Sequence, residues 1–241
     1  MNVLIICNSA SGLYDFRGML LNKLISLGHS VKAVVPSVDI PADLESKEKL
    51  KEDGITLIHV RMERRGMNPV KDLGLMRNFF KIVKREKPDL VVTYTVKPNA
   101  YGGIACRLCR VPYAANITGL GTAFQGSGML RKLVTTLYKT AFRRAKVVFF
   151  ENGDNRDTIV NAGIIEKART VVLHGAGVDL EKYRLLPYPT GNAETKFLFI
   201  GRVMKERALT SFSLPCGSYR RTALAVTWMF SAGLMKIIAL K

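Results

Sequence analysis

Short apolar runs and amphipathic segments alternate along the chain as far as about residue 173. The runs are rich in Val, Ile, Leu and Phe and end at polar, proline or glycine residues, which is typical of strands buried on both faces of a parallel sheet. They predict strands over residues 2–7, 30–35, 55–60, 90–92, 113–117, 147–150 and 170–173. The segments between them predict helices over residues 15–27, 44–53, 70–85, 98–110, 129–146 and 154–161. This alternation predicts an α/β fold with a doubly wound, Rossmann-like parallel sheet.

Two neighbouring strands of the predicted sheet end at polar or glycine-rich loops. The strand at 90–92 leads into Thr95–Asn99 (TVKPN), and the strand at 113–117 leads into Asn116–Thr122 (NITGLGT). In an open parallel sheet, ligands bind beyond the carboxyl ends of the strands, so we expect both loops at the binding edge. The small-residue loop Asn8–Gly12 would also let a backbone approach a ligand closely, but its spacing is no dinucleotide-binding G-x-G-x-x-G fingerprint.

The sequence pattern divides the chain into four parts. Residues 1–173 form the predicted Rossmann-like domain and 174–195 a linker. Residues 196–206 are the start of an incomplete second domain, which opens with a strand at 196–201, and 207–241 are an aberrant apolar and basic tail. The last part ends in an apolar stretch over 222–240 that is interrupted by Lys236. Its length approaches the roughly 20 residues of a membrane span, although the lysine weakens that interpretation.

The charge is strongly basic, with 37 Lys and Arg against 19 Asp and Glu and a formal net charge of +18. Such an excess fits nucleic acid, an anionic membrane surface or phosphorylated substrates as partners, or a solvated basic surface. No helix-turn-helix, RNP or zinc pattern supports nucleic-acid binding. The basic segment Arg61–Lys71, with two methionines, fits a solvated loop and a lipid or phosphate contact equally. The basic amphipathic segment Arg131–Lys146 could lie on a membrane, although such a stripe inside an α/β domain is more often a core face with a basic solvent face.

The cysteines and the N-terminus indicate a cytoplasmic protein without a disulfide framework. Cys106 and Cys109 share a face of a predicted apolar helix, and no second ligand pair accompanies them, so core packing is favoured over metal or redox chemistry. We therefore expect no metal site. The strand-length apolar run after Asn2, with no basic region before it, does not resemble a secretory signal.

Four motifs carry a resemblance to a known family: Tyr94–Gly103 (YTVKPNAYGG), Asn116–Thr122 (NITGLGT), Arg64–Pro69 (RRGMNP) and Gly175–Asp179 (GAGVD). With them, the chain resembles the family 4 glycosyltransferases of the two-domain GT-B fold over about residues 1–206. It is similar to bacterial enzymes that add sugars to lipid-linked precursors of capsule, exopolysaccharide or glycoprotein glycans.

The resemblance implies an acceptor-binding N-terminal domain. The positions that inherit an acceptor-side role are Gly12, Lys97, Asn99, Thr118, Gly119 and Gly121. The implied reaction is a retaining transfer of a hexose or N-acetylhexosamine from a nucleotide sugar to a polyprenyl-diphosphate-linked saccharide, without a cofactor. The implied location is the inner face of the cytoplasmic membrane, where the protein would be peripheral. No residue is assigned as catalytic.

The donor side matches the family only at its start. The family motif Gly-Arg-aliphatic-x-x-x-Lys-Gly, which contacts the donor diphosphate, is met by Arg202 and by the charge of Arg207, while Ala208 stands where glycine belongs. With Lys205, these cations are the expected donor-phosphate residues. The family's later paired glutamates have no counterpart. We therefore expect a truncation or frameshift after about Glu206 and no transfer by this chain alone; the alternative is a non-catalytic basic membrane-associated protein.

Overall fold

The computed structural model describes residues 1–37, 41–63, 68–121, 124 and 128–187, together with the backbone of strands 197–201 and 236–240. The chain divides into two compact units, Met1–Tyr183 and Arg184–Lys241. The expected donor-phosphate residues Arg202, Lys205 and Arg207 lie outside the described residues, as does most of the segment after Glu206.

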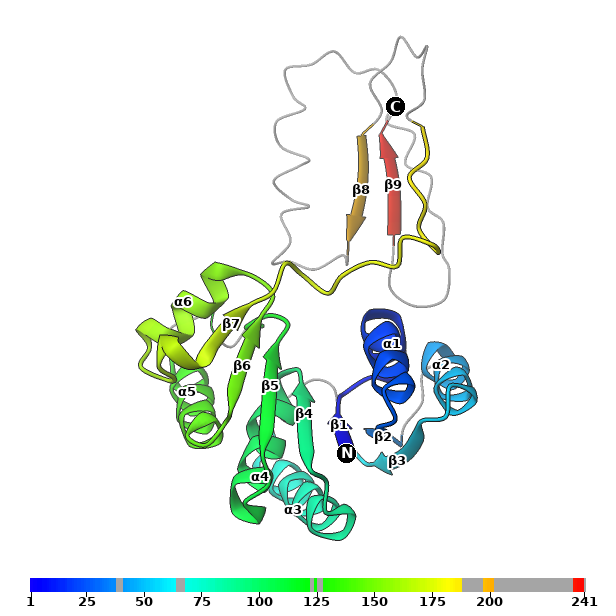
Figure 1. Cartoon of the computed structure of the whole chain (residues 1–241). Coiled ribbons are helices and arrows are strands. Elements are labelled where there is room, and N and C mark those ends of the chain that lie inside the picture. Colours follow the sequence, from blue (N-terminus) through cyan, green and yellow to red (C-terminus); the bar gives the residue numbers. More distant parts are fainter. Residues whose placement is uncertain are drawn as a thin grey trace, which may run out of the picture. The chain divides into compact units, whose positions relative to one another are not determined.

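The first unit is built on one seven-stranded parallel sheet (Figure 1). Its strands are β1 (Asn2–Ile6), β2 (Ser30–Pro36), β3 (Thr56–Val60), β4 (Leu90–Tyr94), β5 (Tyr113–Ile117), β6 (Val147–Phe150) and β7 (Thr170–Val172). The spatial order is β3-β2-β1-β4-β5-β6-β7, so the sheet winds in both directions from β1. All seven predicted strands and the doubly wound arrangement are confirmed.

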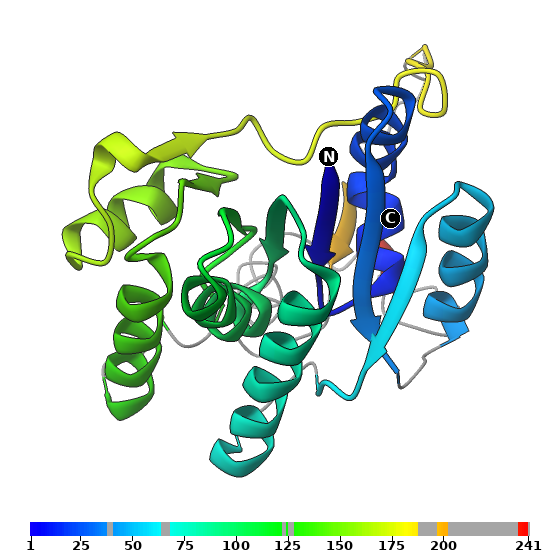
Figure 2. The same cartoon turned by 60° about the horizontal axis from the view of Figure 1, so that its bottom comes forward.

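Helices follow the strands and cover both faces of the sheet (Figure 2). They are α1 (Ala10–Ser26), α2 (Pro41–Glu52), α3 (Pro69–Glu86), α4 (Gly103–Cys109), α5 (Met129–Phe142) and α6 (Gly153–Asn161). A π-helical turn, Pro98–Gly102, leads into α4, and a 3-10 turn, Lys167–Arg169, precedes β7. Each predicted helix is present, with boundaries shifted by a few residues.

The core consists of two clusters that lie on opposite faces of the sheet. On β1, Val3 and Ile5 pack with residues of α1 and α2, whereas Leu4 and Ile6 pack with α3, α4 and α5. This alternation follows from the two-residue period of a strand, and it explains why β1 reads as a continuous apolar run. Cys106 is fully buried in the second cluster, which confirms core packing as its role.

Helix α1 begins five residues earlier than predicted and takes in part of the expected loop. Ser9 is its N-cap, and the Ser9 hydroxyl accepts a hydrogen bond from the Gly12 backbone N–H at 3.0 Å. Gly12 therefore lies in the first turn of a helix rather than in a loop. The serine preceding the helix is the signal that locates this start.

The second unit contains one short antiparallel pair, β8 (Phe197–Gly201) and β9 (Lys236–Leu240). The first of these strands is the one expected at 196–201. The second was not predicted, because the sequence pattern indicated a single apolar stretch over 222–240 rather than a strand. Within the described residues, no helix is both long and apolar enough to cross a bilayer.

Candidate functional site

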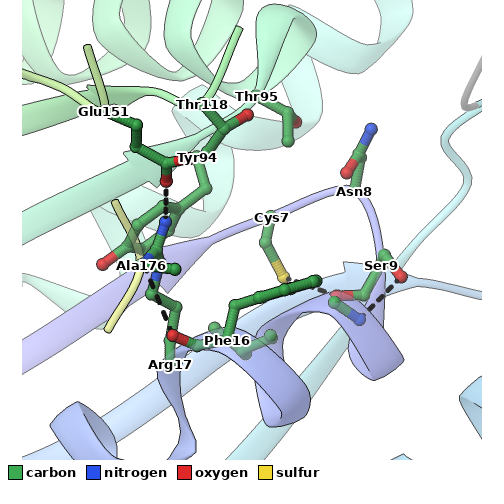
Figure 3. Close-up of a pocket in the computed structure, with 12 residues that line it drawn as sticks. Cys7, Asn8, Ser9, Phe16, Arg17, Tyr94, Thr95, Thr118, Glu151 and Ala176 are labelled. Atoms are coloured by element: carbon green, nitrogen blue, oxygen red, sulfur yellow. Dashed lines mark hydrogen bonds and ion pairs between the residues drawn. The ribbon is translucent and has the colours of Figure 1, made fainter. Parts of the chain in front are cut away.

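A pocket of about 330 Å³ lies at the carboxyl edge of the seven-stranded sheet (Figure 3). Its walls come from the β1–α1 connection, helix α1, and the residues that end or follow β4, β5, β6 and β7. They are Cys7, Asn8, Ser9, Gly12, Leu13, Phe16, Arg17, Tyr94, Thr95, Thr118, Glu151 and Ala176. The pocket is therefore where ligands bind in open α/β sheets.

A partly buried ion pair lies in the pocket wall. The Arg17 guanidinium on α1 donates a hydrogen bond to Glu151 Oε1, which follows β6, and the two side chains are 9% and 20% exposed. The same guanidinium lies 5.0 Å from the centroid of the Tyr94 ring (Figure 3). A guanidinium held by both a carboxylate and an aromatic face has little freedom to move. Burial raises the pKa of Tyr94, so its phenol stays neutral.

The start of helix α1 is tied to helix α2 by a buried carboxylate. Asp43 is 1% exposed, and its Oδ1 accepts hydrogen bonds from the Ser11 backbone N–H and the Ser11 hydroxyl, both at 2.8 Å. The Ser9 hydroxyl donates to the same oxygen at 3.2 Å. These contacts hold the pocket floor in place before any ligand arrives.

Thr95 occupies an unusual backbone conformation at the end of β4. Its φ is +73°, in the left-handed region that a β-branched residue rarely adopts. Its hydroxyl oxygen and the Asn116 side-chain oxygen are the two buried side-chain atoms without a hydrogen-bond partner in the described part of the chain. Strained residues and unpaired polar groups of this kind gather at functional sites.

Lys97 does not line the pocket, although the sequence predicts it as an acceptor-side cation. Its Nζ donates a hydrogen bond to Asp72 Oδ1 at 2.8 Å, and the two side chains are 13% and 6% exposed. Burial and the adjacent Asp72 carboxylate raise the pKa of Tyr101 to about 12. Lys97 is therefore held by α3 beside the binding edge, with its charge balanced in this structure.

The remaining predicted acceptor residues divide between the pocket and its surroundings. Gly12 and Thr118 line the pocket. Asn99 is fully buried, accepts a hydrogen bond from Thr93 Oγ1 at 2.7 Å and donates one to the Asn116 carbonyl at 2.8 Å, so it connects β4 to β5. Gly119 and Gly121 lie in the loop after β5 with open space around them, and Gly121 has a φ of +64°.

Sequence reasoning missed the aromatic and charged residues that line the pocket. A signal for Arg17 existed, because Leu13, Arg17 and Leu21 follow one another at helical spacing and all three are buried. Glu151 could have been found by applying to β6 the strand-end rule that located the loops after β4 and β5. The ion pair itself joins residues 134 positions apart, which no local pattern reveals.

The doubly wound sheet and the pocket at its carboxyl edge define an α/β ligand-binding domain. Residues 14–176, more than half of the chain, match the family described as "Glycosyl transferase 4-like domain". The chain belongs to this family.

Two curated relatives share the same part of the chain. The N,N'-diacetylbacillosaminyl-diphospho-undecaprenol alpha-1,3-N-acetylgalactosaminyltransferase of Campylobacter jejuni is 26% identical over 191 residues, which are 76% of this chain and 48% of the relative. The UDP-Gal:alpha-D-GlcNAc-diphosphoundecaprenol alpha-1,3-galactosyltransferase of Escherichia coli is 29% identical over 137 residues, 55% of this chain and 34% of the relative. The chain thus spans half or less of each relative.

Solved structures share the fold. Anabaena Alr3699/HepE, determined with UDP and glucose, matches 78% of this chain and 47% of its own with a TM-score of 0.55 and 18% identity. UDP-GlcNAc 2-epimerase from Neisseria meningitidis matches 71% of this chain and 46% of its own, with a TM-score of 0.51 and 14% identity. These likenesses establish the arrangement of strands and helices, and nothing about the ligand of this chain.

Proposed function

We propose that this chain provides the acceptor side of a glycosyltransferase that moves a hexose or N-acetylhexosamine from a nucleotide sugar to a polyprenyl-diphosphate-linked saccharide. The observation that carries the proposal is the family match over residues 14–176, which includes Arg17, Tyr94 and Glu151 of the pocket. The names of the two curated relatives support it, since each transfers a sugar to a saccharide on diphosphoundecaprenol.

Transfer requires a donor site that the Rossmann-like unit does not supply. The donor's anomeric carbon must be held against the acceptor hydroxyl, and such positioning accounts for much of the rate of an enzyme. In the resembling family the nucleotide sugar is held mainly by the second domain. This chain meets the donor motif through Arg202 and the charge of Arg207, with Lys205 as a further nearby cation in the sequence. The 241-residue chain alone is therefore proposed to bind acceptor and to form no product.

A chimera tests this function directly. Residues 1–201, which end with β8, are joined to the remaining C-terminal part of the Campylobacter jejuni relative, and the chimera is assayed with nucleotide sugars and undecaprenyl-diphosphate saccharides. Product from the chimera and none from the chain alone is the expected result. Transfer by the purified chain would contradict the proposal that it lacks a working donor site. An inactive but folded chimera would contradict the proposed function.

Lys97 is proposed to meet the acceptor diphosphate. It follows β4, and the Gly119–Gly121 loop, whose open backbone can approach an anion, follows the neighbouring strand β5. A phosphate could replace Asp72 as the partner of Lys97. In the chimera, Lys97→Ala should impair acceptor use far more than hydrolysis of the donor. Unchanged acceptor kinetics in a variant that still unfolds cooperatively would count against this role.

The acceptor lipid also implies a membrane location. We place the protein as a peripheral protein on the inner face of the cytoplasmic membrane, where its excess of basic residues meets anionic lipid. Exposed apolar side chains beside exposed basic ones in the first turns of α3 and α5 support this placement.

A further inference from the structure

The ionic charges that line the pocket cancel. Arg17 and Glu151 are the arginine and the carboxylate among its lining residues, and they pair with each other. The described lining has no lysine, although the chain as a whole carries a net charge of +18. A pocket that bound the diphosphate would be expected to present unpaired cations or several converging backbone N–H groups. At the start of helix α1, which lines the pocket, the Ser11 and Gly12 backbone N–H groups already donate to Asp43 Oδ1 and Ser9 Oγ. This pocket is thus suited to an uncharged ligand.

Glu151 retains capacity to accept hydrogen bonds. A carboxylate has about four lone-pair positions, and Arg17 occupies one of them through Oε1. The Glu151 side chain is 20% exposed and lines the pocket, so hydroxyl groups of a ligand can reach it. Thr118, on the neighbouring strand end, is exposed and adds a hydroxyl to the same wall. The polar part of the pocket therefore matches a ligand with several hydroxyl groups.

The rim of the pocket is aromatic. Phe16 lines the pocket on helix α1 and remains 61% exposed, although burying a phenylalanine is strongly favourable. The faces of aromatic rings carry negative charge density, which attracts the C–H groups on the flat face of a sugar ring. A carboxylate that accepts hydrogen bonds from hydroxyl groups and an exposed ring that packs on C–H groups are together suited to binding a carbohydrate.

We propose that this pocket holds one uncharged sugar ring of the acceptor saccharide, with Glu151 accepting hydrogen bonds from its hydroxyls and Phe16 stacking on its face. Arg17 acts as a positioning residue that fixes the Glu151 carboxylate. A volume of about 330 Å³ fits a monosaccharide unit and not an extended chain. The identity of the ligand as an acceptor rests on the proposed function, whereas the recognition of a sugar ring rests on the pocket alone. The diphosphate lies outside, on the Lys97 side of the edge.

Titration of the full 241-residue chain with methyl glycosides of N-acetylglucosamine and galactose tests the inference, with saturation-transfer-difference NMR as the readout. We expect binding by at least one of the two. Phe16→Ala should weaken it about fivefold, the loss of one aromatic contact. Glu151→Gln, which keeps the size and removes the charge, should weaken it about tenfold.

Met19→Ala is the matched control, because Met19 is 62% exposed on the same helix and does not line the pocket. It should leave sugar binding unchanged. Because Phe16 and Met19 are both largely exposed, neither change should prevent folding, and thermal unfolding checks this. Inorganic pyrophosphate added to the sugar complex should not displace the sugar.

Three results would overturn the inference: no binding of either glycoside, equal losses for Phe16→Ala and Met19→Ala, or displacement of the sugar by pyrophosphate. Failure of the proposed function gives a different pattern. If the glycosides bind as described and the chimera transfers nothing, the proposed function is wrong and the proposed sugar-binding pocket is retained. If the chimera transfers sugar while the isolated glycosides do not bind, the sugar pocket alone fails.

Discussion

Thr95 combines a disfavoured backbone with an unpaired buried hydroxyl at the end of β4. Lys87 and Arg110 also have positive φ values, but both are C-caps of helices, where the left-handed conformation is common. Thr95 has no such explanation, because it follows a strand and is β-branched. Its conformation is therefore imposed by its surroundings at a cost in folding free energy.

Thr95→Gly should raise the free energy of unfolding by about 1 kcal/mol, since glycine adopts a φ of +73° without strain and no longer buries a hydroxyl. Thr118→Gly is the control: Thr118 lines the same pocket without a positive φ, and glycine there should lower stability by up to about 1 kcal/mol. Urea unfolding measures both. A Thr95→Gly variant less stable than Thr118→Gly would mean that the Thr95 side chain has an essential packing role.

We expect the stability of the protein to fall at alkaline pH because of the group formed by Lys97, Asp72 and Tyr101. Tyrosine ionises near pH 10 in an unfolded chain, and the pKa of Tyr101 is raised to about 12 in the folded protein. Between these pH values the unfolded chain loses a proton that the folded chain keeps. The contribution of Tyr101 to stability is therefore fully present below about pH 10 and is lost as the pH rises towards 12, with a slope of at most about 1.4 kcal/mol per pH unit.

Tyr101→Phe should make the loss of stability with rising pH less steep. Urea unfolding of the two proteins, measured from neutral pH up to about pH 11, should give curves that diverge above the ordinary tyrosine pKa. The slope should not vanish, because burial also raises the pKa of Tyr113 and Tyr138. Parallel curves for the variant and the natural chain would show that Tyr101 titrates normally.

At the site, motif reasoning pointed to the edge of the sheet where the pocket lies, but it named only part of the pocket lining. Gly12 and Thr118 line it because both lie within or beside small-residue segments at strand ends. The partner of Lys97 and the burial of Asn99 depend on α3 and β5, which are distant in sequence. Those contacts arise from packing, so the pattern of a single segment could not reveal them.

Among the elements, helix α4 packs unusually closely against α5 through Gly103. A β-carbon added there would lie 3.0 Å from the Ala141 Cβ and 3.3 Å from Cε2 of Tyr113. Gly74, in the exposed part of α3, has nothing within 4 Å of the same position. The two glycines thus differ in packing while both are helical.

This difference predicts opposite effects of the same substitution. Gly103→Ala should lower the free energy of unfolding by about 1–3 kcal/mol through overpacking. Gly74→Ala should raise it by about 0.5–1 kcal/mol, because alanine restricts the unfolded chain and favours the helix. Thermal and urea unfolding measure both changes. Stabilisation by Gly103→Ala would mean that α5 can move away from α4 at little cost.

Helices α3 and α5 present apolar side chains to solvent in their first turns, at the carboxyl edge of the sheet. The exposed residues are Val70, Leu73, Met129, Leu130 and Leu133. Lys71, Arg131 and Lys132 are exposed beside them. Apolar side chains with neighbouring cations are the composition of a surface that enters the headgroup region of an anionic bilayer.

Flotation with anionic liposomes should recover the chain at low salt and less of it at high salt, each basic residue near the surface contributing about 1 kcal/mol. Leu130→Ser should weaken flotation. Leu108→Ser is the control, since Leu108 is similarly exposed at the end of α4, near the opposite edge of the sheet. If flotation does not depend on the salt concentration, or if the two serine variants weaken flotation equally, this edge has no membrane role.

At the scale of the whole molecule, the sequence predicted the architecture of the first unit well. A parallel sheet buried on both faces requires continuous apolar strands separated by amphipathic helices, and that requirement is visible locally in runs such as Val147–Phe150. Strand β9 was missed because its pairing with β8 depends on a contact across about 35 residues that lack a regular pattern. Helix starts were displaced where capping residues were overlooked, as at Ser9.

The position of β1 in the sheet determines the order in which the domain can assemble during synthesis. β1 leaves the ribosome before the other strands of this sheet, and it pairs with β2 on one side and with β4, nearly 90 residues later, on the other. A three-stranded β3-β2-β1 layer can form once Val60 has emerged, but its β1 edge stays open until Leu90–Tyr94 arrives. Open edges of apolar strands attract other chains. In the interval between β3 and β4 the nascent chain therefore exposes an apolar strand edge at which it can aggregate.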